Sequence, residues 1–179
     1  MGFTATAAAG AKVRASSLAA WLTERTPLQA IKTSATSRNT TVSRTADPDL
    51  TLALPANSAW EVQIVLLLSS AANAAGDFSG EIAFPTGSTV SSGGHGLDIG
   101  LASGATSSLT AGTASSSDSS TPTTNIDWGC STIITEAVLR ARVTTSTAGS
   151  VTLNWAQSST NGSNTTVNIG SRIVATKVN

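Results

Sequence analysis

The sequence contains a single cysteine, Cys130, and a single histidine, His95. One cysteine cannot form a disulfide within the chain, so the fold must be stabilised by packing or by assembly. We expect Cys130 to be a small buried apolar residue, with a reactive or intermolecular thiol as the alternative. His95 lies among glycines with no cluster of metal-ligating residues beside it, so we expect no metal and no cofactor.

Charge is also scarce. Lys, Arg, Asp and Glu make up 11% of the chain, and the formal net charge is zero, whereas about 25% is usual in a soluble domain. A neutral chain has no long-range field that attracts nucleic acid or an anionic membrane, so we expect neither as a partner. The longest aliphatic run, residues 64–68, is far shorter than a membrane span.

The sequence has no recognisable catalytic motif. It has no nucleophile elbow of the Gly-x-Ser-x-Gly type, no P-loop and no dinucleotide fingerprint. Asp77 and Glu81 share a predicted strand face, but such carboxylates are ordinary on an exposed surface, so they are not assigned to glycoside hydrolysis. We therefore expect a protein that is not an enzyme. The first residues also lack the pattern of a secretory signal, which favours synthesis in a cytoplasm.

Near the N-terminus, residues 15–28 have the pattern of one short amphipathic helix. Leu18, Trp21 and Leu22 fall at positions i, i+3 and i+4, and Pro27 ends the pattern. A helix of about ten residues is marginal in water, so its apolar side must pack on another surface. We expect these three apolar residues to dock the protein on a larger assembly, with Trp21 as the anchor.

The rest of the chain has the two-residue period of β-strands, with Ser- and Thr-rich loops at 88–125. Strand spacings of about ten residues predict an all-β, jelly-roll-like sandwich, preceded by an N-terminal arm and one short α-helix. We assign residues 1–34 to the docking segment and residues 35–179 to the β-sandwich head. Within the head, 147–149 is predicted to be a hairpin turn, and Gly170 with Ser171 is predicted to be a bulge in one long strand.

The predicted strand over residues 60–68 is apolar on both faces in its second half. Trp60 shares one face with aliphatic neighbours, whereas Val65 and Leu67 lie on the other. The outer face of a two-layer sandwich normally meets water. Val65 and Leu67 must therefore be covered by another segment or by a neighbouring subunit. We predict a homo-oligomer through these residues, with a trimer as the first choice.

Three further residues are candidates for ligand contact. Arg140 and Arg142 share a strand face and could bind a carboxylate of a partner, with ordinary surface ion pairing as the alternative. Trp155, like Trp60, is in phase with aliphatic neighbours and is assigned to the core. Trp128 ends the loop region, so it is the best tryptophan for stacking on a sugar ring, with burial as the alternative.

Several of these segments resemble parts of a known family. The tract over residues 15–32 with Glu24-Arg-Thr-Pro-Leu28, the pattern Leu153-Asn-Trp-Ala-Gln157 and the closing Gly170-Ser-Arg-Ile-Val174 are similar to small accessory structural proteins of tailed bacteriophages, especially those of actinobacteria. The resemblance implies a capsid decoration, head-fibre or minor tail protein. Its location would be the virion, its partners phage capsid or tail proteins, and its site of synthesis the cytoplasm of the bacterial host.

Two functions remain open from the sequence. The first is a non-enzymatic structural protein of a tailed-phage virion that docks on the particle, as a capsid decoration or short head fibre, and projects a β-head. The alternative is a minor tail or receptor-binding protein that acts as a carbohydrate-binding adhesion module on a host surface glycan. The compact head, with no long shaft after the docking segment, favours capsid attachment over tail attachment.

Overall fold

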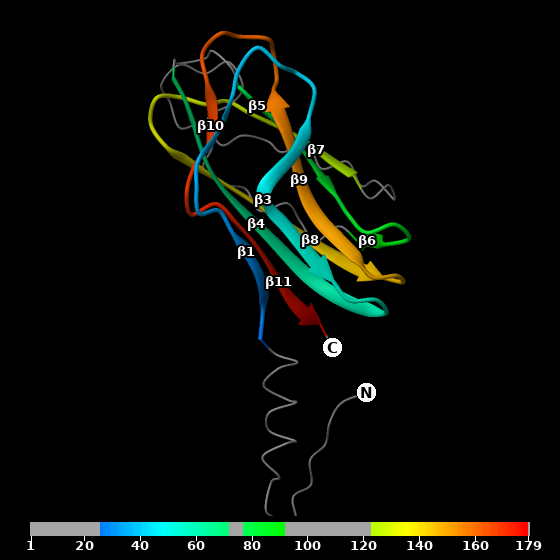
Figure 1. Ribbon diagram of the computed structural model, residues 1–179. Coiled ribbons are helices and arrows are strands. Elements are labelled where there is room, and N and C mark those ends of the chain that lie inside the picture. Colours follow the sequence, from blue (N-terminus) through cyan, green and yellow to red (C-terminus); the bar gives the residue numbers. More distant parts are fainter. Residues whose placement is uncertain (1–25, 72–76, 92–122, 179) are drawn as a thin grey trace, which may run out of the picture.

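The computed structural model describes residues 26–71, 77–91 and 123–178. These residues form two antiparallel sheets that pack face to face (Figure 1), so the predicted all-β sandwich is confirmed. The predicted docking helix with Leu18, Trp21 and Leu22 lies outside the described residues, as does His95. The strands are β1 (Leu28–Ile31), β2 (Thr36–Arg38), β3 (Thr45–Leu54), β4 (Ser58–Ser70), β5 (Phe78–Ala83), β6 (Thr89–Ser91), β7 (Thr123–Trp128), β8 (Thr135–Thr145), β9 (Gly149–Gln157), β10 (Thr165–Val167) and β11 (Arg172–Val178).

The larger sheet, sheet A, is built around the long strand β4. One edge of β4 pairs with β11 and β10, and its other edge pairs with β8. β1 extends the sheet from β11, β2 extends it from β10, and β6 extends it from β8. The smaller sheet, sheet B, has the order β3-β9-β5-β7.

The core fills the space between the two sheets with apolar residues that alternate along the strands. From sheet A, β4 contributes Trp60 and the aliphatic residues at every second position after it, while β8 contributes Leu139 and Val143. Sheet B contributes Leu153 and Trp155 from β9, among others. Trp60 and Trp155 are therefore core residues, as their phase with aliphatic neighbours predicts.

The chain crosses between the sheets where the sequence predicts a hairpin. β8 belongs to sheet A and β9 to sheet B, so residues 146–148 connect the two layers and the hairpin prediction is wrong. Val143 and Val151 both face the core, but from opposite sides of it. Gly149 lies so close to Pro85 that an added Cβ would stand 2.7 Å from the Cβ of Pro85, so a larger residue would not fit this crossover.

The predicted single closing strand is divided into β10 and β11. Residues 168–171 stand opposite only Leu66 and Leu67 of β4, so the predicted bulge at Gly170 and Ser171 is confirmed. Gly170 has a φ of +91° that favours glycine. The turn still satisfies the backbone of Leu67. Its N–H donates to Ser171 Oγ at 2.9 Å, and its carbonyl accepts the N–H of Asn168 at 2.8 Å.

The sandwich begins earlier in the sequence than the predicted boundary at residue 35. β1 pairs with β11, and its residues Leu28 and Ala30 pack against the core. Lys32, which follows β1, is itself buried. The alternation of apolar and polar residues in β1 covers only four positions and directly follows Pro27. It gives no clear strand signal, so residues 28–34 were predicted to be part of the docking segment.

Candidate functional site

The outer face of sheet A, which points away from the core, brings together four residues that the sequence singles out for separate reasons. Directly opposed residues of an antiparallel pair project to the same side of a sheet. Along β4 and β8, the outward pairs are Glu61 with Arg142, Gln63 with Arg140, Val65 with Val138, and Leu67 with Glu136. The two arginines therefore lie on the same surface as Val65 and Leu67.

Val65 and Leu67 differ in how far they are covered. Val65 is only 2% exposed although it lies outside the main core cluster, so a single chain already covers it. Leu67 is half-buried and keeps accessible surface. Of the two residues predicted to form an oligomer interface, Leu67 is therefore the one that a neighbouring subunit can reach.

Arg140 and Arg142 are both exposed. Neither makes an ion pair with another residue in the described part of the chain. Their guanidinium groups therefore remain available to a partner, and Glu61 and Glu136 add exposed carboxylates to the same face. The face thus combines both signs of charge around an apolar centre.

Two exposed isoleucines extend this face and were missed from the sequence. Ile31 is 45% exposed and opposes Arg172, which in turn opposes Val65. Ile169 is 60% exposed and belongs to the turn that packs on Leu67, where an added Cβ on Gly170 would lie 3.3 Å from Leu67 Cδ1. Ile31 belongs to β1, which the periodicity does not predict. Ile169 precedes the bulge at Gly170 and Ser171, where the two-residue period no longer indicates the direction of a side chain.

Trp128 is a core residue and not an exposed ring. It is 4% exposed, and its ring centroid lies 6.2 Å from that of Phe78. The pairing of β7 with β5 sets Trp128 directly opposite Phe78, so both rings point inward. Trp128 is therefore not available to stack on a sugar, and the burial alternative is correct.

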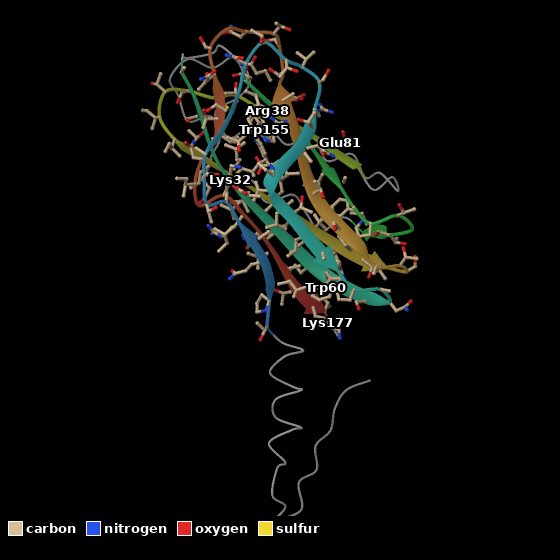
Figure 2. The ribbon with its side chains drawn as sticks, in the orientation of Figure 1. Lys32, Arg38, Trp60, Glu81, Trp155 and Lys177 are labelled. Atoms are coloured by element: carbon tan, nitrogen blue, oxygen red, sulfur yellow. The ribbon has the colours of Figure 1, made fainter. Side chains whose placement is uncertain are left out.

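A buried polar cluster lies at the edge of the sandwich where the segment after β1 meets β3 (Figure 2). Lys32 Nζ donates to Asp47 Oδ1 at 2.8 Å and to Thr36 Oγ1 at 2.7 Å. Asp49 Oδ2 lies 3.5 Å from the same nitrogen. We call Lys32, Thr36, Asp47, Asp49 and Trp155 the Lys32 cluster.

Asp47 is the centre of this cluster because each of its oxygens accepts several hydrogen bonds. Its Oδ1 accepts the backbone N–H groups of Asp49 at 3.1 Å and Leu50 at 3.3 Å, where the register of β3 with β9 is interrupted. Its Oδ2 accepts the indole N–H of Trp155 at 3.0 Å. The one available sequence signal was the Asp47-Pro48-Asp49 segment, which places two acids together in a chain with few charges.

Arg38 closes the cluster from the solvent side. Its guanidinium lies 4.3 Å from the centroid of the Trp155 ring and donates to the carbonyls of Thr45, Ala46 and Trp155. Burial lowers the pKa of Arg38 from its ordinary value, and the charge of Asp47 acts in the opposite direction. The stacking and hydrogen bonds tie β2 to both β3 and β9.

Cys130 is fully buried in the core cluster, as expected for a small apolar residue. Burial raises the pKa of its thiol to about 12, the backbone of Phe78 lowers it, and Asp77 adds to the rise. We expect the folded protein to resist thiol-specific reagents at mildly alkaline pH, and the denatured protein to react fully. Rapid labelling of the folded protein in a colorimetric thiol assay would contradict this assignment.

The same pKa shift has a consequence for stability. The unfolded thiol loses its proton near the ordinary pKa of 9.0, whereas the folded thiol keeps it up to a pKa of about 12. Between these values the unfolded chain binds fewer protons, so stability falls as pH rises. Replacement of Cys130 by alanine should remove this part of the pH dependence in denaturant titrations.

No group of three His, Cys, Asp or Glu residues that could hold a metal ion occurs within residues 26–71, 77–91 and 123–178. In the same residues no helix is long and apolar enough to cross a membrane. Comparison of the sequence with protein-family models and with curated proteins finds no significant match.

Proposed function

We propose that this chain is a non-enzymatic structural protein of a tailed-phage virion, which docks on the particle through its N-terminal segment and projects a jelly-roll head. The observation that carries the proposal is the difference between the two ends of the sandwich. The chain enters and leaves it at one end, because Leu28 at the start of β1 opposes Ala175 near the end of β11 (Figure 1). A domain mounted by this end would present its opposite end outward.

The opposite end is formed by loops that are hydrogen-bonded to one another or to the end of β4. Thr40 N–H donates to the carbonyl of Asn161, and Ser70 N–H donates to the carbonyl of Ser131, both over less than 3 Å. Among the described residues, three connections meet here, at 39–44, 129–134 and 158–164. Loops held on a rigid sandwich suit an outward surface, whereas the docking residues Leu18, Trp21 and Leu22 precede the end at which β1 begins.

The strand order supports the jelly-roll part of the proposal. A jelly roll has two four-stranded sheets formed from two Greek keys, and it is common in viral capsid and lectin domains. If β1 with β2 and β10 with β11 are each counted as one interrupted strand, sheet A contains the first, eighth, third and sixth strands in that spatial order. Sheet B then contains the second, seventh, fourth and fifth. The short strand β6 is an addition to sheet A.

The alternative function, a carbohydrate-binding adhesion module, no longer has its best candidate residue for stacking on a sugar. Trp128 was its best candidate for a sugar platform, and it is buried beside Phe78. We therefore propose attachment to the capsid, as a decoration or short head fibre, and retain tail attachment as the outcome that a localisation experiment would distinguish.

The test is to locate the protein on purified particles of the phage that encodes it. Mass spectrometry should detect the chain in particles, and gold-labelled antibody should mark heads and not tail tips. We expect Trp21→Ala to reduce incorporation, because truncation of a packed Trp costs about 3–5 kcal/mol. Normal incorporation of that variant would show that Trp21 is not the anchor, whereas absence of the chain from particles would overturn the virion assignment itself.

We also propose that the head self-associates through the outer face of sheet A, with a trimer as the expected state. Exposed Ile31 and Ile169 and half-buried Leu67 support this, because burial of an aliphatic side chain is worth about 1.5–3 kcal/mol. Arg140 and Arg142, which form no ion pair with a described residue, add groups on the same face that a neighbouring carboxylate can bind.

For this interface, Ile169→Asp is expected to shift the protein to monomers at micromolar concentration, measured by light scattering or sedimentation velocity. A matched control is Val42→Asp. Val42 is comparably exposed, at 54%, but it lies in the 39–44 loop, whose residues Thr41 and Arg44 bond to Gln157 and Ser79 of sheet B. A wild-type protein that is already monomeric, or equal effects of the two substitutions, would contradict the proposed interface.

A further inference from the structure

The contact between Lys32 and Asp47 is unusual because both side chains are completely removed from solvent. In the ion pairs that Arg44 makes with Glu81 and Asp127, by contrast, both partners are partly exposed. Removal of an ammonium and a carboxylate from water costs several kcal/mol per ion, and their mutual attraction often fails to offset this cost. A neutral product formed from the two groups would avoid it.

The two groups are also held in position to react. Lys32 Nζ lies 2.8 Å from Asp47 Oδ1 and 3.0 Å from Oδ2, so it faces both oxygens of one carboxyl group. Fixed orientation in a dry site can raise the effective concentration of a reacting group to roughly 10⁵–10⁸ M. We propose that Lys32 and Asp47 condense to an amide, so that the protein carries an intramolecular isopeptide cross-link between Nζ and Cγ.

The reaction balances with groups that the protein itself supplies. The Lys32 ammonium gives one proton to the carboxylate of Asp49, whose Oδ2 lies 3.5 Å from Nζ. The neutral amine then attacks Asp47 Cγ, and the Nζ–Cγ bond forms. Asp47 Oδ2 receives a second proton from the nitrogen and the first proton back from Asp49. The Cγ–Oδ2 bond breaks, and Oδ2 leaves as water.

The hydrogen bonds of the two Asp47 carboxylate oxygens suit their different roles in this reaction. Oδ1, which becomes the amide oxygen, already accepts two backbone N–H groups, from Asp49 and Leu50. Backbone donors in this position stabilise the negative charge that develops on an oxygen during attack at a carboxyl carbon. Oδ2, which leaves, accepts the indole N–H of Trp155 at 3.0 Å.

Asp49 is suited to transfer the proton because its side chain is less buried than those of Lys32 and Asp47. Its side chain is 25% exposed, whereas those of Lys32 and Asp47 are fully buried. The cross-link would fasten the segment after the edge strand β1 to β3 in sheet B. This inference does not depend on the proposed virion function, because it concerns only the folded chain.

The experiment is an intact-mass measurement of the purified full-length protein under denaturing conditions. We expect a mass lower than that of the sequence by one water molecule. After trypsin digestion, residues 26–38 and 45–140 should remain joined as one branched species, since no Lys or Arg lies within 45–139 and a modified Lys32 is not cleaved. An unmodified mass with separate peptides would overturn the proposal.

Two conservative variants locate the reaction. Lys32→Arg keeps a cation that can pair with Asp47 but cannot form the amide, and it should show the full mass. Asp49→Asn keeps the size of the side chain but cannot accept the proton, and it too should show the full mass after folding. Loss of water that persists in Lys32→Arg would place the modification elsewhere and refute the cross-link.

Discussion

Replacement of Trp155 by alanine is expected to lower the free energy of unfolding by about 3–5 kcal/mol, the range observed for loss of a buried Trp or Phe. Trp155 is completely buried, and its ring stacks on Phe78 with centroids 5.7 Å apart. Its indole N–H also donates to Asp47, and the Arg38 guanidinium lies 4.3 Å from the centroid of its ring. Because small domains are stable by only about 5–15 kcal/mol in total, the variant should be partly or fully unfolded at physiological temperature.

The conservative control separates ring packing from the hydrogen bond. Trp155→Phe keeps an aromatic ring against Phe78 but leaves Asp47 without one donor, so it should be less destabilised than the alanine variant. Urea denaturation followed by far-UV circular dichroism measures both. A change below about 1 kcal/mol for Trp155→Ala, typical of surface positions, would show that this part of the core is not packed as described.

Removal of Asp47 is expected to be the most damaging change at a polar residue. Asp47→Ala leaves the Lys32 ammonium buried without its main partner. Relative to protein in which the pair has not condensed, loss of one member of a buried ion pair costs about 3–5 kcal/mol. The backbone N–H groups of Asp49 and Leu50 lose an acceptor in addition. The measurement is again the free energy of unfolding in urea.

A double variant tests the cause of this loss. Lys32→Met combined with Asp47→Leu removes both charges and replaces them with apolar side chains, which is often neutral or stabilising relative to a broken pair. We expect the double variant to be more stable than Asp47→Ala alone. Neither of the two can form an amide between residues 32 and 47, so the comparison is independent of the cross-link. Equal or lower stability of the double variant would show that the backbone contacts of Asp47 outweigh the uncompensated charge.

The alternation of apolar residues was sufficient to predict the sandwich and most of its core. Trp60, Trp155 and Val143 are buried as their phase requires. The alternation does not indicate which sheet a strand joins, however, because each of the two sheets directs an apolar face into the same core. The connection at 146–148 was therefore predicted to be a hairpin, although it joins the two layers.

The functional surface was predictable only in part. The period of β4 and β8 placed Val65, Leu67, Arg140 and Arg142 on outward positions, but their proximity depends on a pairing that no local pattern reveals. The Lys32 cluster was beyond prediction, since its contacts join residues from three separate segments. Lys32 and Asp47 are 15 positions apart, and Trp155 lies 108 positions from Asp47.

The position of β11 has a consequence for the timing of folding. This strand is formed by residues 172–178, yet it lies inside sheet A between β1 and β4. While the chain is synthesised from its N-terminus, β1 has no partner and one edge of β4 stays open until residues 172–178 have left the ribosome. Pairing between segments so distant in the sequence is slow, and open strand edges invite aggregation. The growing chain therefore stays vulnerable until β11 has been made, and this strand then closes the sheet.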